Sequence, residues 1–157
     1  MISNKSNIAR LGITDDVLYR AQAELCKRHF FKFVQAFWGA IIPEEPVFNW
    51  HIPYLCGELE KMAYYIVNRL PKPYDLIVNI PPGTTKSTIV TIMFPAWLWT
   101  LDPSLRVISS SYSSDVSLDQ AQKSKDIITC EKYRRLFPEV CIRRDKSGKG
   151  FYGNTAG

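Results

Sequence analysis

The segment Asp75–Val90, with the sequence DLIVNIPPGTTKSTIV, most limits what this chain can fold into. A short run of β-favouring residues, Leu76–Ile80, ends at two prolines and a glycine. A Lys-Ser-Thr triplet then opens a segment that is compatible with a helix. A phosphate-binding loop requires this order of strand, tight loop, lysine, hydroxyl and helix, because the amides and the dipole at a helix N-terminus attract anions. The segment therefore predicts a phosphate site.

The residues after the two prolines carry the predicted phosphate contacts. Pro81 and Pro82 have no N–H, so the amides that follow them must bind the phosphate oxygens. The predicted nucleotide-binding residues are Gly83, Thr84, Thr85, Lys86, Ser87 and Thr88. Lys86 is the predicted catalytic residue, placed against the β- and γ-phosphates, and the Ser87 hydroxyl is the predicted Mg²⁺ ligand. ATP and Mg²⁺ are therefore the predicted cofactors.

The loop departs from the usual pattern G-x-x-x-x-G-K-[ST]. When the pattern is aligned on Lys86, its two glycine positions hold Ile80 and Thr85, and the only glycine of the loop is Gly83. A non-glycine residue in the left-handed region costs about 1–2 kcal/mol, so we expect Gly83 rather than Thr85 to adopt that conformation. The alternative is an ordinary Pro-Pro-Gly turn followed by a surface lysine.

Composition sets broad limits on the function. The chain has 157 residues and a net charge of +5, without any run of five or more basic residues. This mild excess is compatible with an anionic partner but does not indicate one. Four cysteines without a C-x-x-C pair and only two histidines predict reduced thiols in a cytosolic protein and no zinc site. The most apolar run, Ile89–Leu101, is too short to cross a bilayer and predicts a buried helix, so we expect no membrane partner.

Apolar periodicity predicts several helices and two further strands. Thr14 is the predicted N-cap of a first helix, because Asp15 and Asp16 follow it. A continuous apolar stripe predicts an amphipathic helix over 52–70. The other predicted elements are an apolar stretch over 30–42, a helix over 87–100 bent at Pro95, a strand over 105–111, helices over 113–129 and 133–137, and a short strand over 140–142.

Strand, crossover helix and strand form a βαβ unit, in which Leu76–Ile80 and Leu105–Ser110 would be parallel and adjacent or nearly so. The predicted fold class is therefore α/β, a P-loop NTPase-like parallel sheet with flanking helices. We expect residues 1–47 to form an N-terminal helical segment and residues 48–157 to form a partial ATPase domain. The nearest candidate for an acidic (Walker B) strand end is Trp97–Asp102, whose sequence suits a helix end, so we expect the domain to be truncated before that strand.

Four blocks of the sequence resemble the large subunit of tailed-bacteriophage terminases. They are Phe48–Leu55 ahead of a helix, the Pro-Pro-rich loop 81–88, Val107–Ser114 and Tyr133–Pro138. The resemblance covers about residues 30 to 140. It implies the N-terminal ATP-binding part of an enzyme that hydrolyses ATP to drive duplex DNA into a capsid. It also implies that Trp50 and His51 line the adenine, and the alternative for both residues is core packing at the start of the helix over 52–70. The implied partners are double-stranded DNA held non-specifically by its phosphates, the portal and the small terminase subunit. A ring of full-length subunits and a location in the host cytoplasm are also implied.

Two other functions fit the same residues. One is a non-enzymatic binding module, which the missing acidic strand end favours. The other is part of a different P-loop ATPase such as a helicase, because fold alone does not decide between those activities. Arg106, Arg134, Arg143 and Arg144 are candidate arginine fingers by chemistry only, and a surface role is the stronger interpretation for each.

Overall fold

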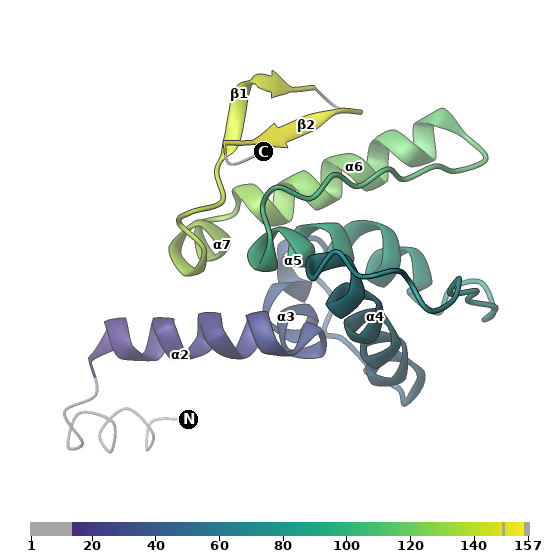
Figure 1. The fold of residues 1–157 in the computed structure, drawn as a ribbon, viewed down its shortest axis with the longest axis horizontal. Helices are drawn as coiled ribbons and strands as arrows, with labels where there is room; N and C mark the ends of the chain where they lie inside the picture. The colour runs from purple at the N-terminus through teal and green to yellow at the C-terminus, as the bar shows by residue number, and fades with distance from the viewer. Residues whose placement is uncertain (1–13, 149, 156–157) are drawn as a thin grey trace.

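Helices make up most of the computed structural model, which describes residues 14–148 and 150–155 (Figure 1). The helices are α2 (Asp15–Arg28), α3 (Phe30–Phe37), the 3₁₀ turn η1 (Trp38–Ala40), α4 (His51–Val67), the π-helical η2 (Thr88–Met93), α5 (Phe94–Leu101), α6 (Ser114–Thr129) and α7 (Glu131–Leu136). The strands β1 (Ile142–Ser147) and β2 (Tyr152–Asn154) form an antiparallel pair in which Ile142 faces Asn154. Between Ile142 and Ser147 the register shifts.

The predicted parallel sheet is wrong. The structure is 58% helical, and the sheet described in it has two antiparallel strands near the C-terminus. Leu76–Ile80 forms no strand, and neither do residues 105–111, so both are drawn as coil in Figure 1. Ile77 and Ile108 point into solvent, with 87% and 95% of their surfaces exposed. A β-favouring composition indicates extended backbone, but a sheet also needs a hydrogen-bonding partner, and neither segment meets one in the described part of the chain.

The local signals for helices were more reliable. The Thr14 hydroxyl accepts a hydrogen bond from the Val17 N–H at 3.4 Å, which confirms the predicted N-cap. The predicted stripe of 52–70 forms α4, which buries Ile52, Leu55, Cys56, Leu59 and Ala63. That helix ends three residues early, and Arg69 follows it with a left-handed φ of 55°. The predicted strand at 140–142 is wrong in position, since β1 begins at Ile142.

The helix after the loop runs without a break from Lys86 to Leu101 and changes its winding on the way. Its middle part, η2, is π-helical, and the Phe94 N–H donates to the Ile89 carbonyl five residues back. Pro95 follows at once and cannot donate to the carbonyl four residues before it. The π-helical segment therefore ends next to the proline that removes an α-helical hydrogen bond. A change of winding thus takes the place of the simple bend that was predicted at Pro95.

A single aromatic core joins these helices. Phe30 packs on Trp97 with ring centroids 4.9 Å apart, and Phe33, Phe37 and Phe137 surround Tyr133. The Tyr133 hydroxyl donates to the Ala96 carbonyl at 2.9 Å, and burial raises the pKa of that phenol well above its usual range. Trp97 Nε1 donates to the Cys26 carbonyl at 2.8 Å. The polar tips of both buried side chains are thus satisfied, as the interior of a protein requires.

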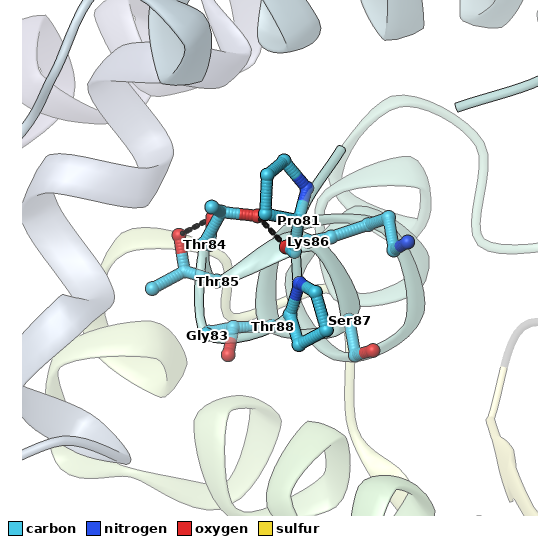
Figure 2. Close-up of a pocket in the computed structure, with 8 residues that line it drawn as sticks. Pro81, Gly83, Thr84, Thr85, Lys86, Ser87 and Thr88 are labelled. Atoms are coloured by element: carbon cyan, nitrogen blue, oxygen red, sulfur yellow. Dashed lines mark hydrogen bonds between the residues drawn. The ribbon is translucent and has the colours of Figure 1, made fainter. Parts of the chain in front are cut away.

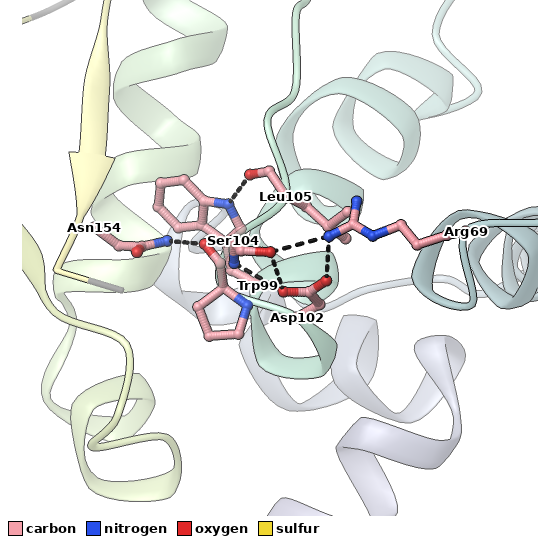
Figure 3. A network of polar contacts seen from close by, with 7 residues as sticks. Arg69, Trp99, Asp102, Ser104, Leu105 and Asn154 are labelled. Carbon is pink, nitrogen blue, oxygen red and sulfur yellow. Dashed lines mark hydrogen bonds and ion pairs between the residues drawn. The ribbon is translucent and has the colours of Figure 1, made fainter. Parts of the chain in front are cut away.

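A polar cluster fastens the turn that follows α5 (Figure 3). Asp102 accepts hydrogen bonds from the Ser104 hydroxyl at 2.7 Å and from the Ser104 N–H at 2.9 Å, and it pairs with Arg69 at 2.9 Å. Trp99 Nε1 donates to the Leu105 carbonyl, and the Asn154 amide donates to the Pro103 carbonyl at 2.7 Å. The turn is therefore held both from the end of α4 and from β2.

We expect Asp102→Asn to change how the free energy of unfolding depends on pH. The Ser104 hydroxyl, the Ser104 N–H and Arg69 hold the pKa of the Asp102 carboxyl below its ordinary value. A lowered folded-state pKa adds stability that is present above the unfolded-state pKa of about 3.9 and is lost as pH falls through the folded-state pKa. Urea unfolding followed by tryptophan fluorescence should show wild type more stable than Asp102→Asn at about pH 6, with the difference shrinking below about pH 4. Glu45→Gln, in an exposed loop, is the control and should leave the pH profile unchanged. A difference that stays constant with pH would contradict the assignment.

Candidate phosphate-binding site

A pocket of about 350 Å³ lies at the loop 81–88, at the start of the long helix (Figure 2). Its lining consists of the loop residues themselves, Pro81 to Thr88. The volume is at the lower end of the range that small-ligand pockets occupy. The structure thus brings all six predicted phosphate contacts together.

Two loop residues adopt left-handed backbone angles. Gly83 has φ 78°, as predicted, but Thr85 also has φ 61°, so the expectation that Gly83 alone would take this conformation is wrong. A β-branched residue rarely occupies the left-handed region. The Thr85 hydroxyl donates to the Thr84 carbonyl at 2.6 Å, and the Thr84 hydroxyl donates to the Pro81 carbonyl at 2.7 Å. These short contacts help to hold the loop in its strained shape.

The loop uses its carbonyls internally and leaves its amides open. The Ile89 N–H donates to the Thr85 carbonyl at 3.0 Å, and Lys86 Nζ reaches the Ile80 carbonyl at 3.5 Å. In the described part of the chain, no backbone N–H from Gly83 to Thr88 donates a hydrogen bond. These are the unpaired N-terminal donors of a helix, next to the positive end of its dipole. The amide N–H groups of the loop are therefore free to donate hydrogen bonds to a ligand.

Lys86 and Ser87 supply the polar side chains beside these amides. Lys86 is half-buried and Ser87 is exposed. In Figure 2 both side chains extend to the opposite side of the view from Thr84 and Thr85. The lysine therefore keeps only a long contact with a carbonyl, which an anion of full charge would displace.

The start of α4 meets the loop. His51 Nε2 lies 3.3 Å from the Thr84 carbonyl oxygen, and since a carbonyl only accepts, this nitrogen carries the proton in the contact. Trp50 packs edge-on against the His51 ring, with centroids 6.2 Å apart, and leaves 80% of its surface exposed. Sequence reasoning placed both residues near the nucleotide but missed the contact between His51 and Thr84, because no spacing rule links position 51 to position 84.

Other candidates are less suited to hold a ligand. A second pocket, of about 470 Å³, lies between α2, α4 and α5, but its polar groups serve the fold. Glu60 accepts from the Phe30 N–H at 2.6 Å, and Lys27 pairs with Glu139 at 3.0 Å. Burial raises the pKa of the Cys56 thiol on α4 to about 12, which makes it a poor nucleophile. Among residues 14–148 and 150–155, no three His, Cys, Asp or Glu side chains are grouped as a metal site.

Comparisons of the chain with protein-family models, with curated proteins and with solved structures found no match. Within the described residues, none of the helices has the length and apolar character needed to cross a bilayer.

The strain at Thr85 predicts an unusual order of stability between two substitutions. At a left-handed position glycine is favoured over alanine, so Thr85→Gly should be more stable than Thr85→Ala by about 1 kcal/mol. Both variants lose the hydroxyl, so its hydrogen bond cancels in the comparison. At the neighbouring Thr84, where φ is not positive, the order should reverse, with alanine more stable by roughly 0.5–1 kcal/mol. Chemical denaturation of the four variants measures both differences, and the same order at the two positions would refute the strained geometry.

Proposed function

We propose that the loop 81–88 binds the polyphosphate of a nucleotide, with ATP and Mg²⁺ as ligands. The observation that carries the proposal is the open row of amides from Gly83 to Thr88, with no internal acceptor in the described part of the chain. Phosphate oxygens are acceptors that satisfy several such donors at once. The bound anion would also gain from Lys86, because a charge-assisted hydrogen bond is stronger than its neutral equivalent.

A second helix adds to the positive potential at this site. α4 begins at His51, and His51 touches the loop, so the N-terminal ends of α4 and of the helix from Lys86 lie near each other. Each end carries roughly half a positive elementary charge. The two dipoles therefore favour the same anion, which supports a highly charged ligand such as a triphosphate.

The remaining groups of the nucleotide have candidate contacts nearby. Ser87 is the exposed hydroxyl that would hold Mg²⁺, which would neutralise phosphate charge. Trp50 offers an exposed aromatic surface beside the loop for the base, with His51 at its edge. Together they extend the binding site from phosphate to base.

The larger proposal is that the chain is the N-terminal ATP-binding part of a DNA-packaging terminase large subunit. Two of the four resembling blocks, Phe48–Leu55 and the loop 81–88, are in contact through His51, which favours a shared site for them. The partners would be duplex DNA, the portal and the small terminase subunit, with ring assembly in the full-length form. The location would be the host cytoplasm.

The described residues favour binding over hydrolysis. The nearest sequence candidate for a catalytic acid, Asp102, lies at the C-cap of α5 and is bound by Ser104 and Arg69. It stands at the far end of the long helix from the loop, so it is not available to a nucleotide there. The non-enzymatic binding module is therefore the second candidate function for this chain.

Lys86→Ala tests the phosphate site. Loss of a hydrogen bond to a charged group costs about 1.5–3 kcal/mol, so the affinity for Mg·ATP should fall by roughly 10- to 100-fold. Isothermal titration calorimetry measures the affinity, and a phosphate-release assay should show little or no turnover by wild type. Lys61→Ala removes an exposed lysine that pairs with Glu58 on α4 and should bind like wild type. Equal affinity of Lys86→Ala and wild type would overturn the proposal.

Binding to duplex DNA should be weak and steeply dependent on salt. With a net charge of +5 and no basic run, any contact falls on phosphates and releases counterions. A complex that neutralises even two phosphates weakens by about tenfold between roughly 50 and 200 mM salt. Mobility-shift titrations at the two salt concentrations with two unrelated duplexes measure this effect. Tight, sequence-selective binding that ignores salt would contradict the packaging interpretation and indicate a DNA-recognition module.

A further inference from the structure

The geometry points to His51 as a positioning residue that holds the peptide between Thr84 and Thr85 in the orientation that presents the Thr85 N–H to an anion. The inference rests on the proposed phosphate site and names a residue that would tune it. It starts from two observations that concern the same peptide plane. His51 Nε2 donates to the Thr84 carbonyl at 3.3 Å, and Thr85 has a left-handed φ of 61°.

A peptide unit is planar, and its carbonyl and its N–H point in opposite directions. The Thr84 carbonyl is drawn towards the start of α4 by His51, so the Thr85 N–H of the same plane must face away from α4. That N–H belongs to the row of open amides from Gly83 to Thr88. The contact with His51 therefore fixes the direction of one of the proposed phosphate donors.

Without His51, the strain at Thr85 favours the opposite orientation. Rotating the plane by half a turn changes φ of Thr85 from +61° to roughly −120°, the extended region that β-branched residues prefer. The left-handed penalty of a non-glycine residue corresponds to about a five- to thirtyfold preference for that flipped state. The flipped peptide points its carbonyl, a proton acceptor, towards the anion.

The Thr85 hydroxyl cannot replace His51 as the external anchor. It donates to the Thr84 carbonyl at 2.6 Å, but donor and acceptor belong to neighbouring residues and move with the loop. His51 is the first residue of α4, whose Ile52 and Leu55 are buried in the core. Among the described residues, the histidine is the one that ties this peptide to an element whose position the core fixes.

The experiment measures tripolyphosphate affinity by isothermal titration calorimetry in the full chain. His51→Phe keeps a ring but removes the donor, and it should weaken binding by about five- to thirtyfold, because affinity falls with the fraction of loop in the competent state. His51→Gln, which keeps an N–H donor, should recover most of that loss. His29→Phe is the control, because His29 is an exposed histidine whose side chain caps no helix, and it should bind like wild type.

A double-mutant cycle with Thr85→Gly separates positioning from a general structural effect. Glycine accepts positive and negative φ about equally, so the flip gains little there. In the Thr85→Gly background His51→Phe should weaken binding by less than about threefold, whereas a role for His51 in folding alone would give the same loss in both backgrounds.

The outcomes distinguish this inference from the proposed function. If wild type binds tripolyphosphate and His51→Phe binds equally well, or if its loss is unchanged by Thr85→Gly, the positioning role is wrong and the phosphate site stands. If wild type does not bind tripolyphosphate, the proposed function fails and the inference fails with it. If His51→Phe does not fold, His51→Ala, which also removes the donor, takes its place in both backgrounds and is judged by the same two outcomes.

Discussion

Burial of the helix from Lys86 to Leu101 is the constraint on which the rest of the structure depends. Ile89, Met93 and Ala96 have no exposed surface, and α6, α4, α3 and α2 all pack against parts of this helix. The Ala96 carbonyl of this helix accepts a hydrogen bond from the Tyr133 hydroxyl, and Trp97 Nε1 donates a hydrogen bond to the Cys26 carbonyl of α2. A buried helix of this kind cannot shift without opening the aromatic core, so the amides at its exposed first turn are held in a fixed direction.

The sequence predicted the helices well because their signals are local. A capping threonine, the apolar stripe of α4 and the run from Ile89 to Leu101 each describe the chain within a few turns, and the structure follows them closely. The sheet could not be predicted in the same way. Leu76–Ile80 alternates between half-buried and exposed positions, as a strand does, yet a strand exists only when a second segment supplies its hydrogen bonds. The antiparallel pair that does form, β1 with β2, overlaps the predicted strand over 140–142 only at Ile142.

The conformation of the loop 81–88 could also be predicted only where it depends on local sequence. Its sequence predicted which amides gather at the helix N-terminus and which glycine is left-handed. It did not predict that Thr85 would be left-handed as well, because no local rule places a β-branched residue in that region and no spacing rule reports the contact between His51 and the Thr84 carbonyl. Strain at a non-glycine residue persists only where the surroundings hold it, and it gathers at ligand sites. The residue that breaks the local rule thus lies at the centre of the site proposed on independent grounds.

Contacts at both ends join α4 to the long helix. At one end His51, the first residue of α4, contacts Thr84, and at the other Arg69, just beyond α4, pairs with Asp102. The two helices therefore run in the same direction. Parallel dipoles side by side repel each other, and two N-termini at the same place leave a concentration of positive potential unless an anion meets it. The fold accepts this arrangement because burial of the apolar stripe of α4 outweighs the repulsion between exposed helix ends. An anion at the loop would remove the repulsion, so phosphate binding and the packing of α4 on the long helix should stabilise each other.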